Sequence, residues 1–449
     1  MFKLRQINLS NKYLLPGIKR WILIFGIGIT FIIFGIALLL ELRPLTQLSN
    51  LAWKLLRWIA DLVPAQISGP IILGFGAVIV IAAIVSTLKT VIDVTIRESP
   101  SMSSKDPSQS VLQALERASR RGHGPKIVAI GGGTGLSTLL RGIKNYSTNI
   151  TAIVTVGDDG GSSGRLREEL KVVPPGDIRN CIVALSDEEE VTTSLFQYRF
   201  TEGSLKGHSL GNLFLAALCD ISGDMAKATL VATRILRTVG KVLPSADQAI
   251  HLKAELEDGT IIEGESKIPD SEGRIKRVYA EELPPPLPES IEAIKEAELI
   301  ILGPGSLYTS IIPNLLFAEI VNAIKKSKAK VLYVCNLVQD RETRNYTAYD
   351  FLNTIEQHAN AKIIDAILVN APESWNLEKG NPIQVNLDKI TTQSVEVVIR
   401  SKLQEANGRH SPLRLARSII QWFNMRNTGK EHQQINSGAS VPYASSNIS

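Results

Sequence analysis

The stretch 126–140, KIVAIGGGTGLSTLL, decides the fold because it joins an apolar run to a glycine-rich turn and then to a helical pattern. The run is almost wholly apolar, as a strand buried in a parallel sheet is. Glycines in the turn permit positive φ and the close approach of a ligand, and the start of a helix offers N–H groups to an anion. A purely structural tight turn is the alternative. We predict that a phosphate-bearing nucleotide binds on Gly131, Gly132, Gly133, Thr134 and Gly135.

Two standard nucleotide motifs do not fit this turn. No Gly-Lys-Ser/Thr follows it, so it is not a P-loop, and residue 136 is leucine, where G-x-G-x-x-G has its last glycine. An oxidoreductase that uses NAD(P) is therefore a weak hypothesis. The acidic residue expected about 20 residues after such a turn is not found in a clear strand context, although Asp158 lies roughly 25 residues on.

Apolar runs of strand length recur along the chain and alternate with helical patterns. They span 150–156, 299–302, 330–334 and 363–369. This alternation predicts an α/β domain over 125–425 with a mainly parallel sheet and crossover helices. One region differs, because 250–268 holds two alternating strands around Asp258-Gly259, and 274–281 is a candidate third strand. We expect a small antiparallel insertion there.

Polar, glycine-rich segments follow several of these runs, at the strand ends where ligands of parallel sheets bind. Asp158 and Asp159 follow the second run and are suited to ribose hydroxyls, to Mg²⁺ beside phosphates, or to capping a helix. Ser162 and Ser163 lie in a second amide-rich turn, and Arg165 can neutralise phosphate charge. A helix cap requires only one such side chain, so two adjacent aspartates with three glycines favour ligand binding over capping.

Three further segments hold candidate residues. PPGDIRN (174–180) offers Asp177 and Asn180, for which ligand binding and helix capping are equally plausible. GHSLGNL (207–213) offers His208 and Asn212; His208 can contact phosphate or transfer a proton, although a structural role is more common and no aspartate is placed for a triad. GPGSLYTS (303–310), with Gly305 and Ser306, repeats the order of strand, glycine bend and helix, and we expect it to face the first turn.

The first hundred residues are unlike the rest. Residues 21–40 and 70–88 are uncharged, apolar and long enough to cross a bilayer, so we predict two transmembrane helices within 1–98. The excess of basic residues before the first span and after the second puts both termini and the main domain in the cytoplasm, on a cell membrane. The segment 51–62 is a candidate interfacial helix. A polar linker (99–124) and a disordered tail (426–449) flank the domain.

Charge and cysteine content argue against two other classes of protein, namely nucleic-acid-binding proteins and proteins with a cysteine metal site. A net charge of +5, without a basic run, does not indicate nucleic-acid binding. The three cysteines, at 181, 219 and 335, lack metal-ligand spacing and are typical of buried thiols in a reducing compartment.

Six motifs, in this order, resemble those of the YvcK-type gluconeogenesis factors, which are related to the CofD 2-phospho-lactate transferases. They are GGGTGLSTLLRG (131–142), VTVGDDGGSSGRLR (154–167), PPGDIRN (174–180), GHSLGNL (207–213), VLPS (242–245) and GPGSLYTSIIPNLL (303–316). The segment GRHSPLRLA (408–416) is similar to the family's Arg-His-Asp-Pro, with Ser411 in place of aspartate. The segment 336–343 is one residue shorter than the family pattern and lacks its Pro-Gly, so the resemblance leaves the sugar open.

The resemblance implies a Rossmann-like three-layer α/β/α domain that binds UDP-sugars such as UDP-N-acetylglucosamine. It implies no established catalytic residue; Asp158, Asp159 and His208 are candidates, and the two aspartates are the candidate Mg²⁺ ligands. The ligand-binding positions that it implies are Gly131 to Gly135, Asp158, Asp159, Ser162, Arg165, Asp177, Asn180, His208, Asn212, Gly305, Ser306 and Arg409.

Two functions follow as hypotheses. The first is a membrane-tethered regulator that binds a UDP-sugar and is needed for cell shape and envelope synthesis during gluconeogenic growth. Its expected partners are regulatory proteins of envelope synthesis and, in a homo-oligomer, further copies of the chain. The second is a Mg²⁺-dependent transferase of a nucleotide-activated phospho-group, like the 2-phospho-lactate transferases.

Overall fold

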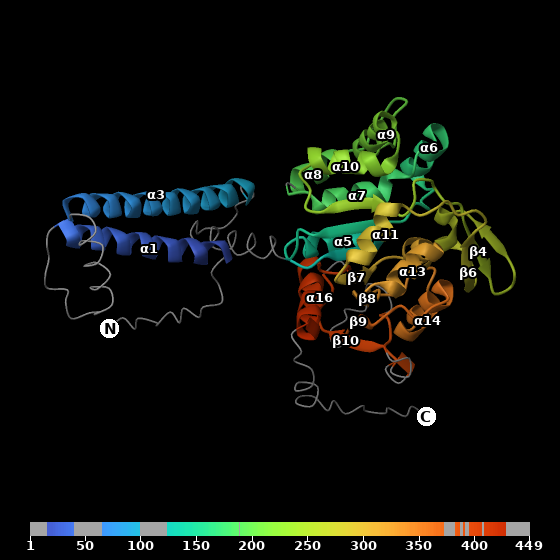
Figure 1. Cartoon of the computed structure of the whole chain (residues 1–449). Coiled ribbons are helices and arrows are strands. Elements are labelled where there is room, and N and C mark those ends of the chain that lie inside the picture. The colour runs from blue at the N-terminus through green and yellow to red at the C-terminus, as the bar shows by residue number, and fades with distance from the viewer. Residues whose placement is uncertain are drawn as a thin grey trace, which may run out of the picture. The chain divides into compact units, whose positions relative to one another are not determined.

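The computed structural model describes residues 16–39, 65–98, 124–187, 189–371, 382–386, 389–390, 395–405 and 408–427. The chain divides into two compact units, Met1–Gly122 and His123–Ser449 (Figure 1). The predicted interfacial helix at 51–62, the linker up to residue 123 and the tail from residue 428 lie outside the described residues.

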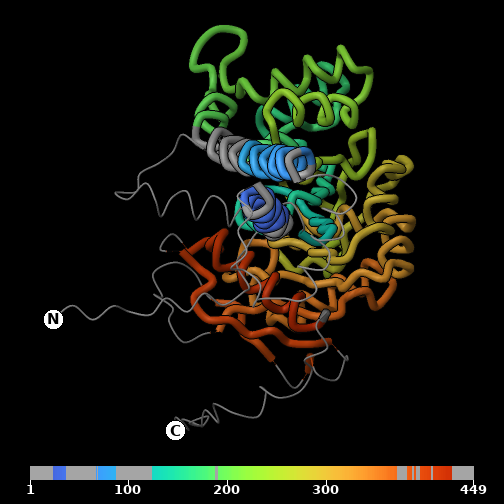
Figure 2. The backbone as a smooth tube through the Cα atoms, turned by 60° about the vertical axis from the view of Figure 1, so that its left-hand side comes forward, coloured from blue at the N-terminus to red at the C-terminus, as the bar shows by residue number. Residues whose placement is uncertain are grey.

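The first unit contains two long helices, α1 (Pro16–Leu39) and α3 (Ala65–Glu98), which lie side by side (Figures 1 and 2). By length and composition, α3 can cross a membrane over Gly69–Ser86. The apolar part of α1 among the described residues is the shorter segment Ile24–Ile36. Within the part of the chain that the structure describes, α3 is therefore the helix of this unit that meets the criterion, and the two-span topology stays a prediction.

Small residues form the contact between these helices. Buried positions recur every seven residues, at Gly28 and Gly35 on α1 and at Gly69, Gly76 and Ala83 on α3. A Cβ atom added to Gly76 would lie 3.0 Å from the carbonyl oxygen of Gly28, so the two backbones almost touch. Large apolar side chains are exposed instead: Phe25, Ile27, Ile29, Phe31, Ile33, Ile36, Ile71, Phe75, Val78 and Ile81. We call the buried row of Gly28, Gly35, Gly69, Gly76 and Ala83 the hairpin seam.

A seven-stranded parallel sheet forms the centre of the second unit, in the order β10-β9-β8-β7-β1-β2-β3. The strands are β1 (Ile127–Gly131), β2 (Ile150–Val154), β3 (Lys241–Pro244), β7 (Leu299–Leu302), β8 (Lys330–Val334), β9 (Ala366–Asn370) and β10 (Glu396–Arg400). The chain moves outward from β1 in one direction and from β7 in the other. The topological switch point, where such sheets bind ligands, therefore lies between β1 and β7.

Helices cover both faces of this sheet (Figure 1). On one face lie α5 (Gly133–Ile143), α7 (Pro175–Leu185) and α16 (Pro412–Asn427). On the other lie α11 (Pro288–Glu296), α13 (Ala318–Lys326) and α14 (Ala348–Ala359). After β7 the chain forms η3 (Leu307–Ile311) and α12 (Ile312–Leu315). The predicted α/β fold with a mainly parallel sheet is confirmed.

Two insertions complete the domain. Between β2 and β3, a group of helices packs beside α7: α6 (Gly161–Leu170), α8 (Glu189–Gln197), α9 (Leu210–Ser222) and α10 (Met225–Ile235). The predicted antiparallel insertion is a three-stranded sheet of β4 (Leu252–Leu256), β5 (Ile261–Glu263) and β6 (Ile275–Ala280), with the 3-10 helix η2 (Glu265–Asp270) between β5 and β6. The candidate third strand is therefore confirmed.

Candidate ligand-binding site

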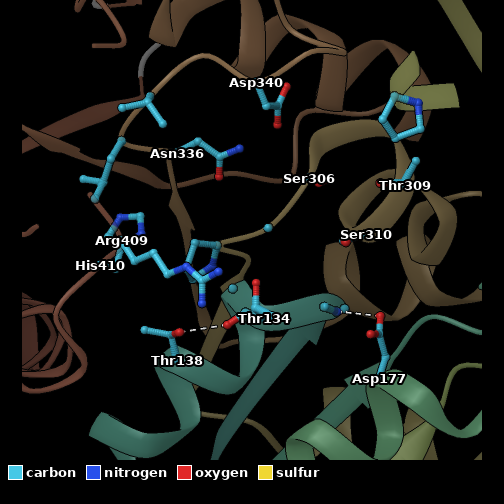
Figure 3. Close-up of a pocket in the computed structure, with 18 of the residues that line it drawn as sticks. Thr134, Thr138, Asp177, Ser306, Thr309, Ser310, Asn336, Asp340, Arg409 and His410 are labelled. Carbon is cyan, nitrogen blue, oxygen red and sulfur yellow. Dashed lines mark hydrogen bonds between the residues drawn. The ribbon is translucent and has the colours of Figure 1, made fainter. Parts of the chain in front are cut away.

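A cavity of about 600 Å³ lies at the carboxyl ends of the central strands (Figure 3). Its volume is within the range of pockets that bind small molecules and cofactors. The lining comprises Gly132, Gly133, Thr134, Gly135, Thr138, Asp158, Asp177, Glu265, Pro269, Pro304, Gly305, Ser306, Thr309, Ser310, Asn336, Leu337, Val338, Asp340, Gly408, Arg409 and His410. The segments that follow β1, β2, β7 and β8 all contribute, so the cavity coincides with the switch point of the sheet.

The glycine turn after β1 is fixed by contacts on two sides. Gly133 has φ +64° and its N–H donates to Oδ2 of Asp177 at 2.5 Å. A Cβ atom added to Gly135 would lie 2.3 Å from the carbonyl oxygen of Pro304, so a side chain there would push the two turns apart. The structure thus brings the first turn and the Gly303–Ser306 turn into contact, as the sequence predicted.

Four carboxyl groups line this cavity, and Asp158, Asp177 and Glu265 act on one another electrostatically. Burial, and then the nearby charge of Asp158, raises the pKa of Asp177 to about 6. Burial, followed by the charges of Asp158 and Asp177, raises the pKa of Glu265 to about 8. The pKa of Asp158 is also raised, mainly by burial. Because each negative charge opposes its neighbours, the cavity favours protons or a cation beside these groups.

The fourth lining acid, Asp340, lies beside the buried Glu342. Burial, and then the charge of Asp340, raises the pKa of Glu342 to about 8. The side chain of Thr309 hydrogen-bonds both Glu342 and Glu265. The N–H of Tyr308 donates to Oε1 of Glu342 at 3.0 Å. The acidic side of the cavity therefore continues into the protein interior.

The structure separates the predicted pair Asp158 and Asp159. Asp158 lines the cavity and accepts the N–H of Gly160 at 2.9 Å. Asp159 accepts the N–H groups of Glu265 and Ser266, both at 2.9 Å, and does not line the cavity. Asp159 holds the start of η2 and so places Glu265 in the site. Within the described part of the chain, no group of three or more His, Cys, Asp or Glu side chains is arranged to hold a metal ion.

Several predicted residues form a buried hydrogen-bond network around Arg179. The Nη1 of Arg179 donates to Oγ of Ser209 at 2.5 Å and to Oδ1 of Asn212 at 2.7 Å. Its Nη2 donates to Oδ1 of Asn180 at 2.9 Å. Arg179 thus orients two of the predicted ligand-binding residues, although neither lines the cavity.

The same network reaches the cavity through serines. Asn212 donates from Nδ2 to Oγ of Ser162 at 3.1 Å, and this oxygen is 3.1 Å from Nδ1 of His208. The pKa of His208 is lowered, mainly by burial. Ser163 hydrogen-bonds the carboxyl group of Asp158. Ser162, Ser163, His208 and Asn212 therefore lie behind Asp158 rather than in the lining.

Three other predicted residues occupy different places. Gly131 ends β1 and is buried in the sheet. Arg165 donates to the carbonyl oxygen of Lys206 at 3.0 Å and lies outside the lining. Arg409 lines the cavity, and Figure 3 shows its side chain extending toward Thr134 and Thr138 on the first turn.

Sequence reasoning missed several lining residues. Glu265 follows the edge strand β5 and Gly264 in the antiparallel insertion, where the strand-end rule for parallel sheets does not apply. Asn336 and Asp340 follow β8, in a segment that the strand-end rule does mark, although neither residue was selected from it. His410 is adjacent to Arg409 in the quoted GRHSPLRLA segment, which was a usable signal.

Comparisons with known proteins agree with this architecture. The family model of 2-phospho-L-lactate transferase CofD matches residues 127–403. A putative gluconeogenesis factor of Nostoc sp. is 43% identical over 441 residues, which are 95% of each chain. The gluconeogenesis factor of Bacillus subtilis is 50% identical over 287 residues, 62% of this chain and 90% of that one. A crystal structure of a UPF0052-family protein from Bacillus halodurans has a TM-score of 0.64 and 45% identity, covering 66% of this chain and 99% of that one. The chain therefore belongs to the CofD-like family and, within it, to the YvcK family of gluconeogenesis factors.

Proposed function

We propose that this protein is a membrane-tethered regulator that binds a UDP-sugar and controls cell shape and envelope synthesis during gluconeogenic growth. The observation that carries the proposal is the cavity at the switch point, whose floor is a glycine turn at the start of α5. Such a turn suits a diphosphate, because helix N-termini present N–H groups and a positive dipole to anions.

The acids of the cavity define how a diphosphate would be accommodated. Asp158 and Asp177 would repel phosphate oxygens unless a cation lies between them. Mg²⁺ is suited to this place, since it commonly uses one or two carboxylates together with phosphates. Asp158 and Asp177 would hold the ion, which would neutralise charge between the protein and the ligand. Arg409 supplies a second positive charge from the opposite side of the first turn.

The tether is supported by the composition of the first unit. The window Gly69–Ser86 of α3 is apolar, and only 17% of it is buried. Many large apolar side chains of α1 and α3, such as Ile33, Ile71 and Val78, are exposed, which suits an apolar solvent. Basic residues before α1 and after the apolar part of α3 support a cytoplasmic position of the domain. There it would meet regulatory proteins of envelope synthesis, and further copies of itself.

Calorimetry on the full-length protein in detergent tests the binding. Titration with UDP-N-acetylglucosamine and MgCl₂ should give saturable heat, and EDTA should weaken the binding. Asp177→Asn should reduce the dependence on Mg²⁺. Absence of saturable heat with every UDP-sugar tested would contradict the proposal.

The acidic cluster also favours the second function, a Mg²⁺-dependent transferase of a nucleotide-activated phospho-group. A transferase needs a cation near the group that moves, and Asp158, Asp177 and Glu265 share one cavity. Turnover of nucleotide-activated donors should then be lost in Asp158→Asn. Turnover that survives this substitution would argue against the cation role.

A further inference from the structure

His410 has an unusual place in the cavity wall. Its backbone is fixed, because His410 pairs with Gln404 in a β-bridge and the N–H of Ser411 donates to the carbonyl oxygen of Leu403 at 2.7 Å. The side chain lines the cavity, although the residue is only 9% exposed (Figure 3). A buried imidazole must satisfy two nitrogen atoms.

One nitrogen of His410 is satisfied within the protein and the other is not. The backbone carbonyl of Cys335, just after β8, accepts a hydrogen bond from the ring. The buried Nε2 has no hydrogen-bond partner among the residues that the structure describes, so the bond to Cys335 involves Nδ1. A merely structural histidine explains the Nδ1 contact but leaves Nε2 without a role.

The protonation state decides what Nε2 can bind. Burial lowers the pKa of His410 to about 4, so the ring is neutral at physiological pH. With Nδ1 carrying the proton, Nε2 presents a lone pair and accepts hydrogen bonds only. Ionised phosphate oxygens also only accept, so they are not partners for this atom. The partner must carry an O–H or N–H group.

The position of His410 agrees with that chemistry. It contacts the end of β8, which lies two strands from β1 in the sheet order. Neighbouring strands are about 4.8 Å apart, so the ends of β8 and β1 are roughly 10 Å apart. This is the distance at which the non-phosphate part of a nucleotide-sugar would lie.

We propose that Nε2 of His410 accepts a hydrogen bond from a hydroxyl or amide N–H of the bound nucleotide-sugar and thereby selects ligands that carry a donor at this point. This inference rests on the proposed function. His410 is a specificity-determining residue in this view, and it requires no chemical step.

Two substitutions at His410 separate this role from a structural one. In His410→Asn, the side-chain amide can still donate to the Cys335 carbonyl, but nothing replaces Nε2. In His410→Gln, the longer side chain can put an acceptor oxygen near the position of Nε2. The full-length protein in detergent is titrated calorimetrically with UDP-N-acetylglucosamine and with UDP, and thermal unfolding is recorded for each variant.

We expect His410→Asn to weaken UDP-N-acetylglucosamine binding about tenfold, because a buried acceptor contact is lost, and His410→Gln to recover most of it. A loss restricted to UDP-N-acetylglucosamine locates the donor on the sugar, and an equal loss for UDP locates it on the uridine; either supports the inference. Unchanged affinity in His410→Asn, or equal losses in both variants with a lower melting temperature, would overturn it. Absence of binding by the unsubstituted protein would instead overturn the proposed function.

Discussion

The two units of this protein are packed in opposite ways. In the domain, large apolar side chains such as Leu139, Ile301 and Tyr308 are buried. In the hairpin of α1 and α3, glycine and alanine are buried, whereas Val78 and Ile81 are at least 60% exposed. Both units use glycine where backbones approach, since a Cβ atom on Gly142 of α5 would lie 1.9 Å from the carbonyl oxygen of Pro412.

The difference teaches which solvent each unit is suited to. In water, burying large apolar side chains supplies most of the stability of a domain. In lipid, a side chain gains little by leaving the solvent, so helices pair through small residues that allow close backbone contact. The hairpin seam has the second pattern. Four experiments test whether the two units obey these different rules.

The largest effect is expected in the domain core. Ile301→Asp would bury an unpaired carboxylate at the centre of β7, where the side chain is fully buried. We expect a loss of about 5 kcal/mol or more and no cooperative unfolding transition in differential scanning fluorimetry. Ile301→Val, which removes one methylene, should cost only about 1 kcal/mol. A cooperative transition in Ile301→Asp would show that this strand is not in the core.

The same type of substitution in the hairpin should affect membrane insertion rather than folding. Ile81→Asp places a charge on the exposed side of α3, at a cost of about 3 kcal/mol in lipid. We expect less protein in the membrane fraction after carbonate extraction, with UDP-sugar binding unchanged. Val191→Asp, on an exposed apolar position of α8, is the matched control and should change neither. Full retention of Ile81→Asp in membranes would mean that this face does not contact lipid.

The stability of the domain should depend on pH because of its buried acids. The pKa of Asp177 is about 6 in the folded protein against 3.8 ordinarily, so the folded state binds more protons between these values. The free energy of unfolding should therefore fall as pH rises from about 4 to about 6, by at most about 3 kcal/mol. Glu265 extends the same trend toward pH 8, since its pKa is raised to about 8.

Urea unfolding from pH 4 to pH 8 measures this dependence. Asp177→Asn should flatten the slope, whereas Asp258→Asn should not, because Asp258 lies on an exposed turn where the N–H of Thr260 lowers its pKa. An identical slope in Asp177→Asn would contradict the assignment. The apolar segments of the hairpin, Ile24–Ile36 and Gly69–Ser86, contain no titratable side chain and should not respond.

The smallest effect is expected at the hairpin seam. Gly76→Leu would force α1 and α3 apart and weaken their pairing by about 1–3 kcal/mol. Gly74→Leu is the control, because a Cβ atom there meets nothing within 4 Å. Pairing of the helices can be measured by cross-linking cysteines introduced in place of Phe31 and Phe75. The centroids of these two rings are 5.9 Å apart. Equal cross-linking in both variants would show that the seam does not hold the hairpin.

The central strands were predictable because each is a buried, continuously apolar run. Residues 299–302 and 330–334 coincide with β7 and β8. The outer strands β3 and β10 were not predicted. Strand β3 has only four residues and ends in Pro244, and β10 is partly exposed, so neither has a distinct apolar run. An outer strand depends on its one neighbour more than on its own pattern.

The candidate site was predictable in part for the same reason. The glycine turns and Asp158 lie within a few residues of strand ends, and the carboxyl ends of neighbouring strands meet at one edge of a parallel sheet. Glu265 is held at the cavity by Asp159, 106 residues earlier, which accepts its N–H. A local sequence pattern cannot predict a contact between residues so far apart in the chain.

The sequence alone determined the strand–turn–helix unit at 126–140, the other central strands and the apolar character of the first unit. These features depend on local sterics, on periodicity and on composition. Only the tertiary structure decided that Asp158 faces the cavity while Asp159 supports η2, and that Asp177 and Glu265 join Asp158. Burial and the distances between charges set the pKa values of these acids, and both arise only when distant segments pack together. The local sequence thus determines the glycine turn, whereas the acidic cavity around it forms only when distant segments pack together.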